Sequence, residues 1–153
     1  MITFIRHGES TFNRFGTMTP DCPLSEEGKV QASRLAGVYD LIVCSPLRRA
    51  RETVQFSGME SREIVISPLC REIGDGNPIN YLVTEQPPFM ETPAQLETRM
   101  QSFLQWLAQR KEPTIAVVTH ALFLYHLFRP LNLHPQLFHN CETLVISRGT
   151  LLR

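Results

Sequence analysis

Residues 2–10 of the chain are ITFIRHGES. The first four are β-branched or aromatic, which predicts a short buried strand. That strand leads directly into Arg6, His7 and Gly8, so a guanidinium, an imidazole and a flexible backbone follow its carboxyl end. In open α/β sheets, ligands bind beyond the carboxyl ends of the strands. This stretch therefore predicts both an α/β fold and a polar site at one edge of its sheet.

Short apolar runs alternate with longer segments of helical spacing along the rest of the chain. Further strands are predicted over residues 41–44, 64–66, 115–119 and 144–147. Helices are predicted from Ser25 to about Val38, from near Leu47, after Thr92-Pro93, and over residues 121–131. This pattern predicts a three-layer α/β/α sandwich with a mainly parallel central sheet. Residues 74–93, rich in Gly, Asn and Pro, are expected to form a long functional loop.

The bulk composition limits what the chain can bind. Its 153 residues fit one domain, residues 1–153, with a single core. Fifteen basic residues balance fifteen acidic ones, so no general field attracts nucleic acid or an acidic membrane.

The most apolar stretch, residues 115–128, is too short to span a bilayer. Four scattered cysteines without a CxxC pair, and no secretory leader, predict free thiols and a cytoplasmic location.

Three predicted strands end in polar groups. Besides Arg6-His7, residues 41–44 lead into SPLRRA at 45–50, and residues 115–119 lead into His120. If these strands are neighbours, two arginines and two histidines meet at one place. Such a cluster is costly to hold together without an anion, and phosphate suits the bidentate geometry of Arg. The pattern therefore predicts a phosphate site.

Each group also has a less specific interpretation. Arg48, Arg49 and Arg51 could form a solvated basic face or a nucleic-acid patch, although no other basic cluster supports the latter. Glu72 could simply pair with Arg71 on the surface. The remaining histidines are expected to be structural; they are His126, His134 and His139. No HxH or HxxxH pair occurs, so no metal site is expected.

Taken together, ordered segments of the chain resemble the histidine phosphatase superfamily, also called phosphoglycerate mutase-like. Arg6-His7-Gly8 is similar to its RHG signature, with Thr11 and Asn13 following. The other matching segments are LSxxG at 24–28, SPLxRAxxT at 45–53, LxxEI at 69–73 and VTH at 118–120. RHG alone is a weak triplet, whereas several such segments in family order are specific.

The resemblance implies roles for named residues. His7 would attack phosphorus while Arg6, Arg49 and His120 hold the phosphate oxygens. Further contacts would come from Asn13, Gly8 and Ala121. Glu72 would protonate the leaving group and then activate water, with Glu9 and Asp75 as alternative acids. No metal or other cofactor is implied, because protein cations can stabilise the transition state. The arginines should lower the pKa of His7, and Gly8 should leave room for phosphate.

The resemblance also limits the function. Ala121 stands where the family commonly has glycine, and the 74–93 loop is modest beside the insertions of true mutases. We therefore expect a metal-independent phosphomonoesterase, a histidine acid-type phosphatase acting on a small phosphorylated substrate or a phosphoprotein. Residues 75–80 are expected to form its rim. The alternatives are a phosphohistidine-protein phosphatase, a mutase-type phosphotransferase, and a non-catalytic phosphate-binding module.

Overall fold

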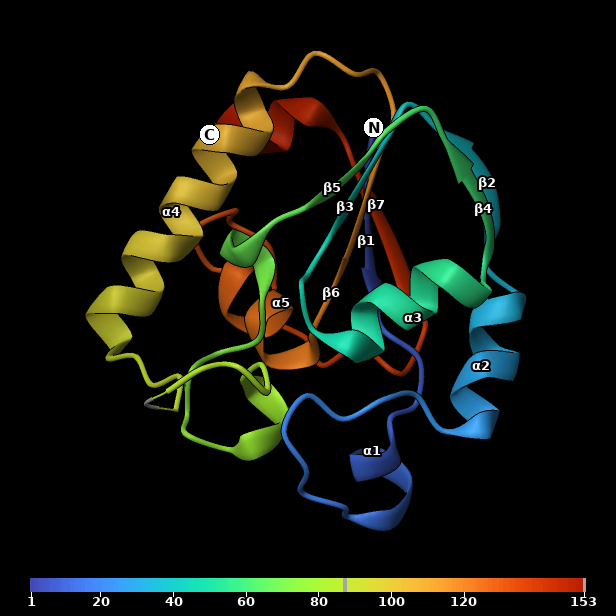
Figure 1. Ribbon diagram of the computed structural model, residues 1–153. Coiled ribbons are helices and arrows are strands. Elements are labelled where there is room, and N and C mark those ends of the chain that lie inside the picture. The colour runs from blue at the N-terminus through green and yellow to red at the C-terminus, as the bar shows by residue number, and fades with distance from the viewer. Residues whose placement is uncertain (87, 153) are drawn as a thin grey trace.

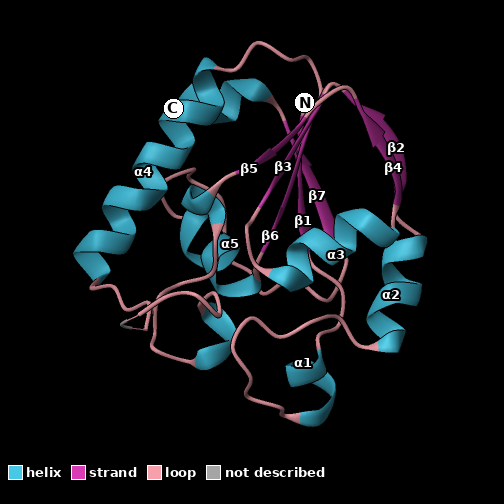
Figure 2. Ribbon diagram, in the orientation of Figure 1, coloured by secondary structure: helices cyan, strands magenta, loops and turns pink. Residues whose placement is uncertain are grey.

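The computed structural model describes residues 1–86 and 88–152, so residues 87 and 153 lie outside the described part of the predicted domain. A five-stranded sheet runs through the middle of the molecule (Figure 2). Its strand order is β5-β3-β6-β1-β7, and only the β1–β7 pair is antiparallel. The strands are β1 (Ile2–Arg6), β3 (Leu41–Cys44), β5 (Ile64–Ile66), β6 (Ile115–Thr119) and β7 (Thr143–Ile146). The prediction of a mainly parallel sheet is confirmed.

Helices cover both faces of this sheet (Figure 1). On one face lie α2 (Glu26–Ser33) and α3 (Arg48–Phe56), and on the other α4 (Pro93–Gln109) and α5 (Ala121–Leu127). Buried apolar residues form a separate cluster on each face. Phe4 and Val117 pack in the cluster of α4 and α5, whereas their neighbours Ile5 and Val118 pack in that of α3. The alternation of side chains along the strands thus builds the expected three layers.

Two predicted helices end earlier than expected. The first was predicted to reach Val38, but α2 ends at Ser33, and Val38 lies in a strand, β2 (Ala36–Tyr39). This strand pairs in parallel with β4 (Gly58–Ser61) in a second, two-stranded sheet. The backbone N–H of Gly58 donates to the carbonyl of Leu35, which ties the end of the helix to a partner distant in sequence. The second, α5, ends at Leu127 instead of near residue 131.

The longest helix is α4, and the other helical segments of the described chain are short. The helix α4 begins at Thr92-Pro93, as the sequence predicts, and Thr92 and Gln95 form a capping box at its start. A five-residue helix, α1 (Thr11–Phe15), was not predicted and follows a similar box. The described residues also form three 3-10 turns: Pro68–Cys70, Pro78–Asn80 and Arg148–Leu152. Within the described chain, no helix combines the length and apolarity that crossing a membrane requires.

The sheet order determines where the polar segments meet. Strands β3, β6 and β1 are adjacent and point the same way. In register, Arg6 lies opposite Thr119, and Cys44 lies opposite Val118. The residues that follow, His7, Ser45 and His120, therefore leave the sheet at the same edge.

Candidate active site

His7 lies at the centre of the polar cluster and is only 3% exposed. Its backbone N–H donates to the carbonyl of Thr119, which fixes the residue beside β6. The ring atom Nδ1 lies 2.6 Å from the carbonyl oxygen of Gly8, and a carbonyl can only accept, so Nδ1 carries the proton. On the other side, Nε of Arg49 donates to Nε2 of His7 at 3.3 Å. His7 therefore presents the lone pair of Nε2 toward Arg49.

The environment of His7 keeps the ring neutral. Burial is the largest cause that lowers its pKa well below the usual value, and the charges of Arg49 and Arg6 lower it further. The sequence analysis attributed this shift to the arginines alone, so burial is the part it missed. A neutral imidazole is the form that can act as a nucleophile.

Arg49 is the buried member of its basic run. It is 3% exposed, and its Nη1 and Nη2 donate to the carbonyl of Ile79 and to Oδ1 of Asn80, at 2.6 and 2.7 Å. Arg48 is exposed and pairs with Glu52. The interpretation as a solvated basic face therefore fits Arg48 but is wrong for Arg49.

Arg6 reaches the same region from the end of β1. Its Nη1 donates to the carbonyl of Phe138 at 2.7 Å, while its Nε is buried and has no hydrogen-bond partner among the described residues. A buried donor without a partner is costly, and a hydrogen bond to a bound anion would remove this cost.

His120 is fully buried directly before α5 and faces His7, with 5.1 Å between the ring centroids. Its Nε2 shares a hydrogen bond of 2.8 Å with Oγ of Ser45, the residue that follows β3. Its Nδ1 is buried and has no partner in the part of the chain that is described. Burial is the main cause that lowers the pKa of His120 well below its usual value, followed by Arg49 and His7.

Glu72 lies against the first turn of α5. Its carboxyl oxygens accept from the backbone N–H groups of Leu122 and Phe123, at 3.2 and 2.8 Å, and from that of Ile73. Burial raises its pKa, and these N–H groups together with Arg49 oppose the rise. A surface pair with Arg71 is not formed, because Arg71 pairs with Glu85. Glu72 is thus a buried carboxyl with a raised pKa, held at the start of the helix that follows His120.

The structure gives Gly8 a role that the sequence analysis did not predict. A Cβ atom there would lie 2.7 Å from the carbonyl oxygen of Gly28 in α2, so packing on that helix requires the glycine. The N–H of Gly8 donates to Oγ1 of Thr53, which in turn donates to the carbonyl of Arg49. Thr53 therefore ties the His7 loop to α3.

The other predicted residues lie at the edge of the cluster. Asn13 is exposed, and its Oδ1 accepts from the N–H of Ser10, whereas Ala121 is the first residue of α5. Glu9 accepts from Ser25 and Arg14, and the bond from Ser25 is the main cause that lowers its pKa, which is unsuited to an acid. Asp75 is exposed.

The described residues include no group of three or more His, Cys, Asp or Glu placed to hold a metal ion.

The sequence analysis gave no role to several residues that hold the cluster together. They are Ser45, Thr53, Ile79 and Asn80. Ser45 and Thr53 lie inside the SPLxRAxxT segment, which is a signal that could have identified them. Ile79 and Asn80 lie in the predicted rim, but their contact with Arg49 depends on the folding of the loop.

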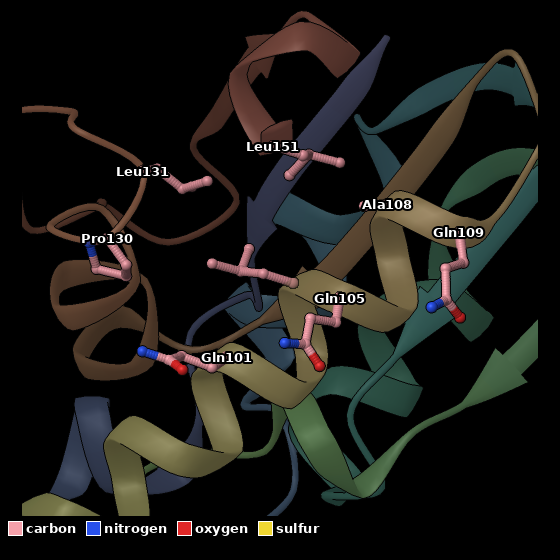
Figure 3. Close-up of a pocket in the computed structure, with 8 residues that line it drawn as sticks. Gln101, Gln105, Ala108, Gln109, Pro130, Leu131 and Leu151 are labelled. Atoms are coloured by element: carbon pink, nitrogen blue, oxygen red, sulfur yellow. The ribbon is translucent and has the colours of Figure 1, made fainter. Parts of the chain in front are cut away.

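Two cavities are lined by none of the residues His7, Arg49, Glu72 and His120. One of 510 Å³ lies between α4 and the C-terminal turn and is lined by residues such as Gln101, Gln105 and Leu151, none of them charged (Figure 3). A larger one of 730 Å³ is lined by Ile73 and Asp75, which follow Glu72, together with the ends of α4 and α5.

Comparison with known proteins yields one family. The model of the histidine phosphatase superfamily (branch 1) matches residues 2–78. Fructose-2,6-bisphosphatase TIGAR B of Danio rerio is 33% identical over 138 residues, covering 71% of this chain and 53% of that protein. Phosphoglycerate mutase-like protein 1 of Arabidopsis thaliana is 43% identical over 61 residues, covering 34% of this chain and 22% of that protein. The chain thus spans about half the length of the first relative and less of the second.

Solved structures give matches over most of the chain. A candidate alpha-ribazole-5'-P phosphatase of Escherichia coli superposes with a TM-score of 0.71 at 26% identity, covering 88% of this chain and 80% of that one. A phosphoglycerate mutase of Thermus thermophilus superposes with a TM-score of 0.67 at 25% identity, covering 93% of this chain and 90% of that one.

Proposed function

Because the chain belongs to the histidine phosphatase superfamily, we propose that it is a metal-independent phosphomonoesterase that works through a phosphorylated His7. One observation carries this proposal most directly. The neutral, buried His7 holds its Nε2 lone pair 3.3 Å from Nε of Arg49 and faces His120. A nucleophile and a cation that point at the same small space are what phosphoryl transfer requires.

In the first step, Nε2 of His7 forms a bond to phosphorus while the bond from phosphorus to the ester oxygen breaks. Arg6, Arg49 and His120 stabilise the charge on the phosphoryl oxygens, so protein groups supply the stabilisation. The proton of Glu72 passes to the leaving oxygen, which its raised pKa permits. In the second step, the Glu72 carboxylate takes a proton from water, the water oxygen bonds to phosphorus, and the electron pair of the P–N bond returns to Nε2.

The class of substrate is a phosphate monoester, either a small phosphorylated molecule or a phosphoprotein. A mutase-type phosphotransferase is the second candidate, favoured by the likeness to the Thermus thermophilus phosphoglycerate mutase. Such an enzyme would return the phosphoryl group to a bound product and would show bisphosphate-dependent isomerisation.

A phosphohistidine-protein phosphatase would need Glu72 less, because its leaving group departs more easily. A non-catalytic module would bind phosphate without turnover.

The test is hydrolysis of para-nitrophenyl phosphate in the presence of EDTA by the wild type, His7→Ala and His134→Ala. His134 is exposed and outside the cluster, so its variant is the matched control. We expect turnover that survives EDTA, is lost in His7→Ala and is unchanged in His134→Ala. Equal turnover in His7→Ala would refute the proposal, and loss of activity in EDTA would refute its metal independence.

A further inference from the structure

Both ends of the Arg49 guanidinium are held, and they are held by different parts of the chain. Its Nε faces His7, while Nη1 and Nη2 face the 3-10 turn Pro78–Asn80 of the rim loop. There Nη1 donates to the carbonyl of Ile79 and Nη2 to the side-chain Oδ1 of Asn80. Arg49 and Asn80 are 3% and 4% exposed, so water does not compete for these bonds.

The chemistry of these acceptors is informative. A buried arginine is commonly paired with a carboxylate, which neutralises it. Here both partners on the loop side are neutral, one a carbonyl and the other a carboxamide. They can orient the guanidinium but cannot cancel its charge. Each of the three nitrogens uses one N–H on these contacts, so two of the five N–H groups of arginine take no part in them.

The orientation of the Asn80 amide is itself fixed. Its Nδ2 donates to Oδ1 of Asp75 at 3.0 Å, which turns Oδ1 toward Arg49. The carbonyl of Asn80 accepts from Nη2 of Arg71. Arg71 is held by Glu85 through two hydrogen bonds, and its guanidinium carbon lies 3.9 Å from the centroid of the Phe89 ring. The turn is therefore anchored from two sides, as a rigid support for Arg49 requires.

We propose that Asn80 is a positioning residue, which together with the Ile79 carbonyl holds Arg49 against His7 and leaves its charge available to the transferred phosphoryl group. The inference rests on the proposed function for its role in turnover, but the contact can be tested without turnover. The other ionisable side chains near His7 and Arg49 are Arg6, His120, Glu72, Asp21 and Cys22, and those that contact Asn80 are Asp75 and Arg71.

The test compares Asn80→Asp, Asn80→Ala and a control, Asn132→Asp. Asn80→Asp keeps the shape and the Oδ1 acceptor, but it adds a negative charge and replaces the Nδ2 donor that faces Asp75. Asn80→Ala removes both the acceptor for Arg49 and the donor to Asp75 without adding a charge. Asn132 is exposed in a turn outside the site, with φ 57°, a conformation that Asp tolerates. Calorimetry measures the binding of inorganic phosphate. NMR of ring-labelled histidine measures the titration of His7, and the pH profile of kcat/KM is recorded in parallel.

Asn80→Asp should weaken phosphate binding by about tenfold or more, the equivalent of about 1.4 kcal/mol. It should also raise the pKa of His7, which moves the acid limb of kcat/KM to higher pH. Asn80→Ala should weaken phosphate binding several-fold and raise KM more than it lowers kcat. Asn132→Asp should leave all three measurements as in the wild type.

The inference is overturned if Asn80→Asp matches Asn132→Asp in both phosphate affinity and His7 titration. If circular dichroism shows that Asn80→Asp does not fold, Asn80→Ala decides, and phosphate binding as tight as that of the wild type overturns the inference. A wild type without turnover would refute the proposed function. A shift of the His7 titration in Asn80→Asp would still support the contact, and no shift would reject it.

Discussion

The nucleophilic character of the site depends on one proton on His7. The carbonyl of Gly8 fixes that proton on Nδ1, and burial keeps the ring from taking up a second one. Nε of Arg49 donates to the other ring nitrogen, Nε2, which therefore carries the lone pair. At the scale of the residue, the backbone carbonyl therefore performs the function that a carboxylate performs for many catalytic histidines, without adding a negative charge near the phosphate.

Replacement of Glu72 tests its proposed role as the proton donor to the leaving group. Glu72→Gln should lower kcat for an alkyl phosphate by about 10² to 10⁴, because a poor leaving group needs the proton. The loss should be smaller for para-nitrophenyl phosphate. Since burial raises the pKa of Glu72, the wild-type rate should persist above the usual carboxyl range and decline as pH rises through that pKa, a limb that the variant lacks.

The measurement is the pH profile of kcat for both esters, with circular dichroism as the control, since Glu72 also binds the first turn of α5. A folded Glu72→Gln variant that hydrolyses the alkyl ester at the wild-type rate would contradict this assignment.

Residue types at strand ends were enough to predict which side chains meet. Arg6, His7 and His120 each follow or end a strand of the parallel sheet, so their convergence follows from strand order. The partners that orient them could not be predicted in this way. The contact of Asn80 with Arg49 joins residues 31 apart through an irregular loop, and no periodic pattern encodes such a contact.

At the scale of the element, the loop after β1 rests on α2 through two glycines. A Cβ atom on Gly28 would lie 2.0 Å from the carbonyl oxygen of Glu9, which is backbone and cannot move aside cheaply. Gly28→Ala should therefore lower the free energy of unfolding by about 1–3 kcal/mol or more, as overpacking does. It should also reduce activity, because the displaced loop carries His7.

The matched control is Gly149→Ala, where the nearest atom to an added Cβ would lie at 3.8 Å. Chemical unfolding of both variants is the measurement. A Gly28→Ala protein as stable as Gly149→Ala would contradict this close packing of α2 on the His7 loop.

The two strands that the sequence analysis missed, β2 and β4, share a physical cause. Residues 36–39 continue an apolar spacing that suits a helix, yet they form β2 because β4, about 20 residues later, pairs with them. Both strands are largely exposed, so no buried alternating pattern marks them. The buried strands β3 and β6 have the predicted bounds, because burial on both faces leaves a continuous apolar run. The edge strand β5 also has its predicted bounds, although two of its three residues are exposed.

For the whole molecule, the buried histidines predict a dependence of stability on pH. Both His7 and His120 have a pKa well below 6.5 when folded, so below 6.5 the unfolded chain takes up protons that the native protein does not. The free energy of unfolding should fall by about 1.4 kcal/mol per histidine for each pH unit between 6.5 and the folded pKa. Above 6.5 this contribution is constant.

Urea unfolding of the wild type and of His7→Gln, above and below 6.5, measures this slope. Glu72 acts in the opposite sense, because its raised pKa lowers the free energy of unfolding as pH rises above 4.5. The contribution of His7 is therefore taken from the difference in the free energy of unfolding between the two proteins at each pH. If the free energy of unfolding changed equally with pH in the two proteins, the account of His7 as a neutral buried base would be contradicted.

The central claim is that His7 carries the phosphoryl group, and the most direct test is to trap it. Turnover of para-nitrophenyl phosphate is stopped with alkaline denaturant, and the digested protein is analysed by mass spectrometry. The account predicts one phosphoryl group on the peptide of His7, stable in base, labile in acid and absent in His7→Ala. A phosphoryl group on His120 or on any other residue, or steady turnover with His7 unmodified at every quench time, would contradict it.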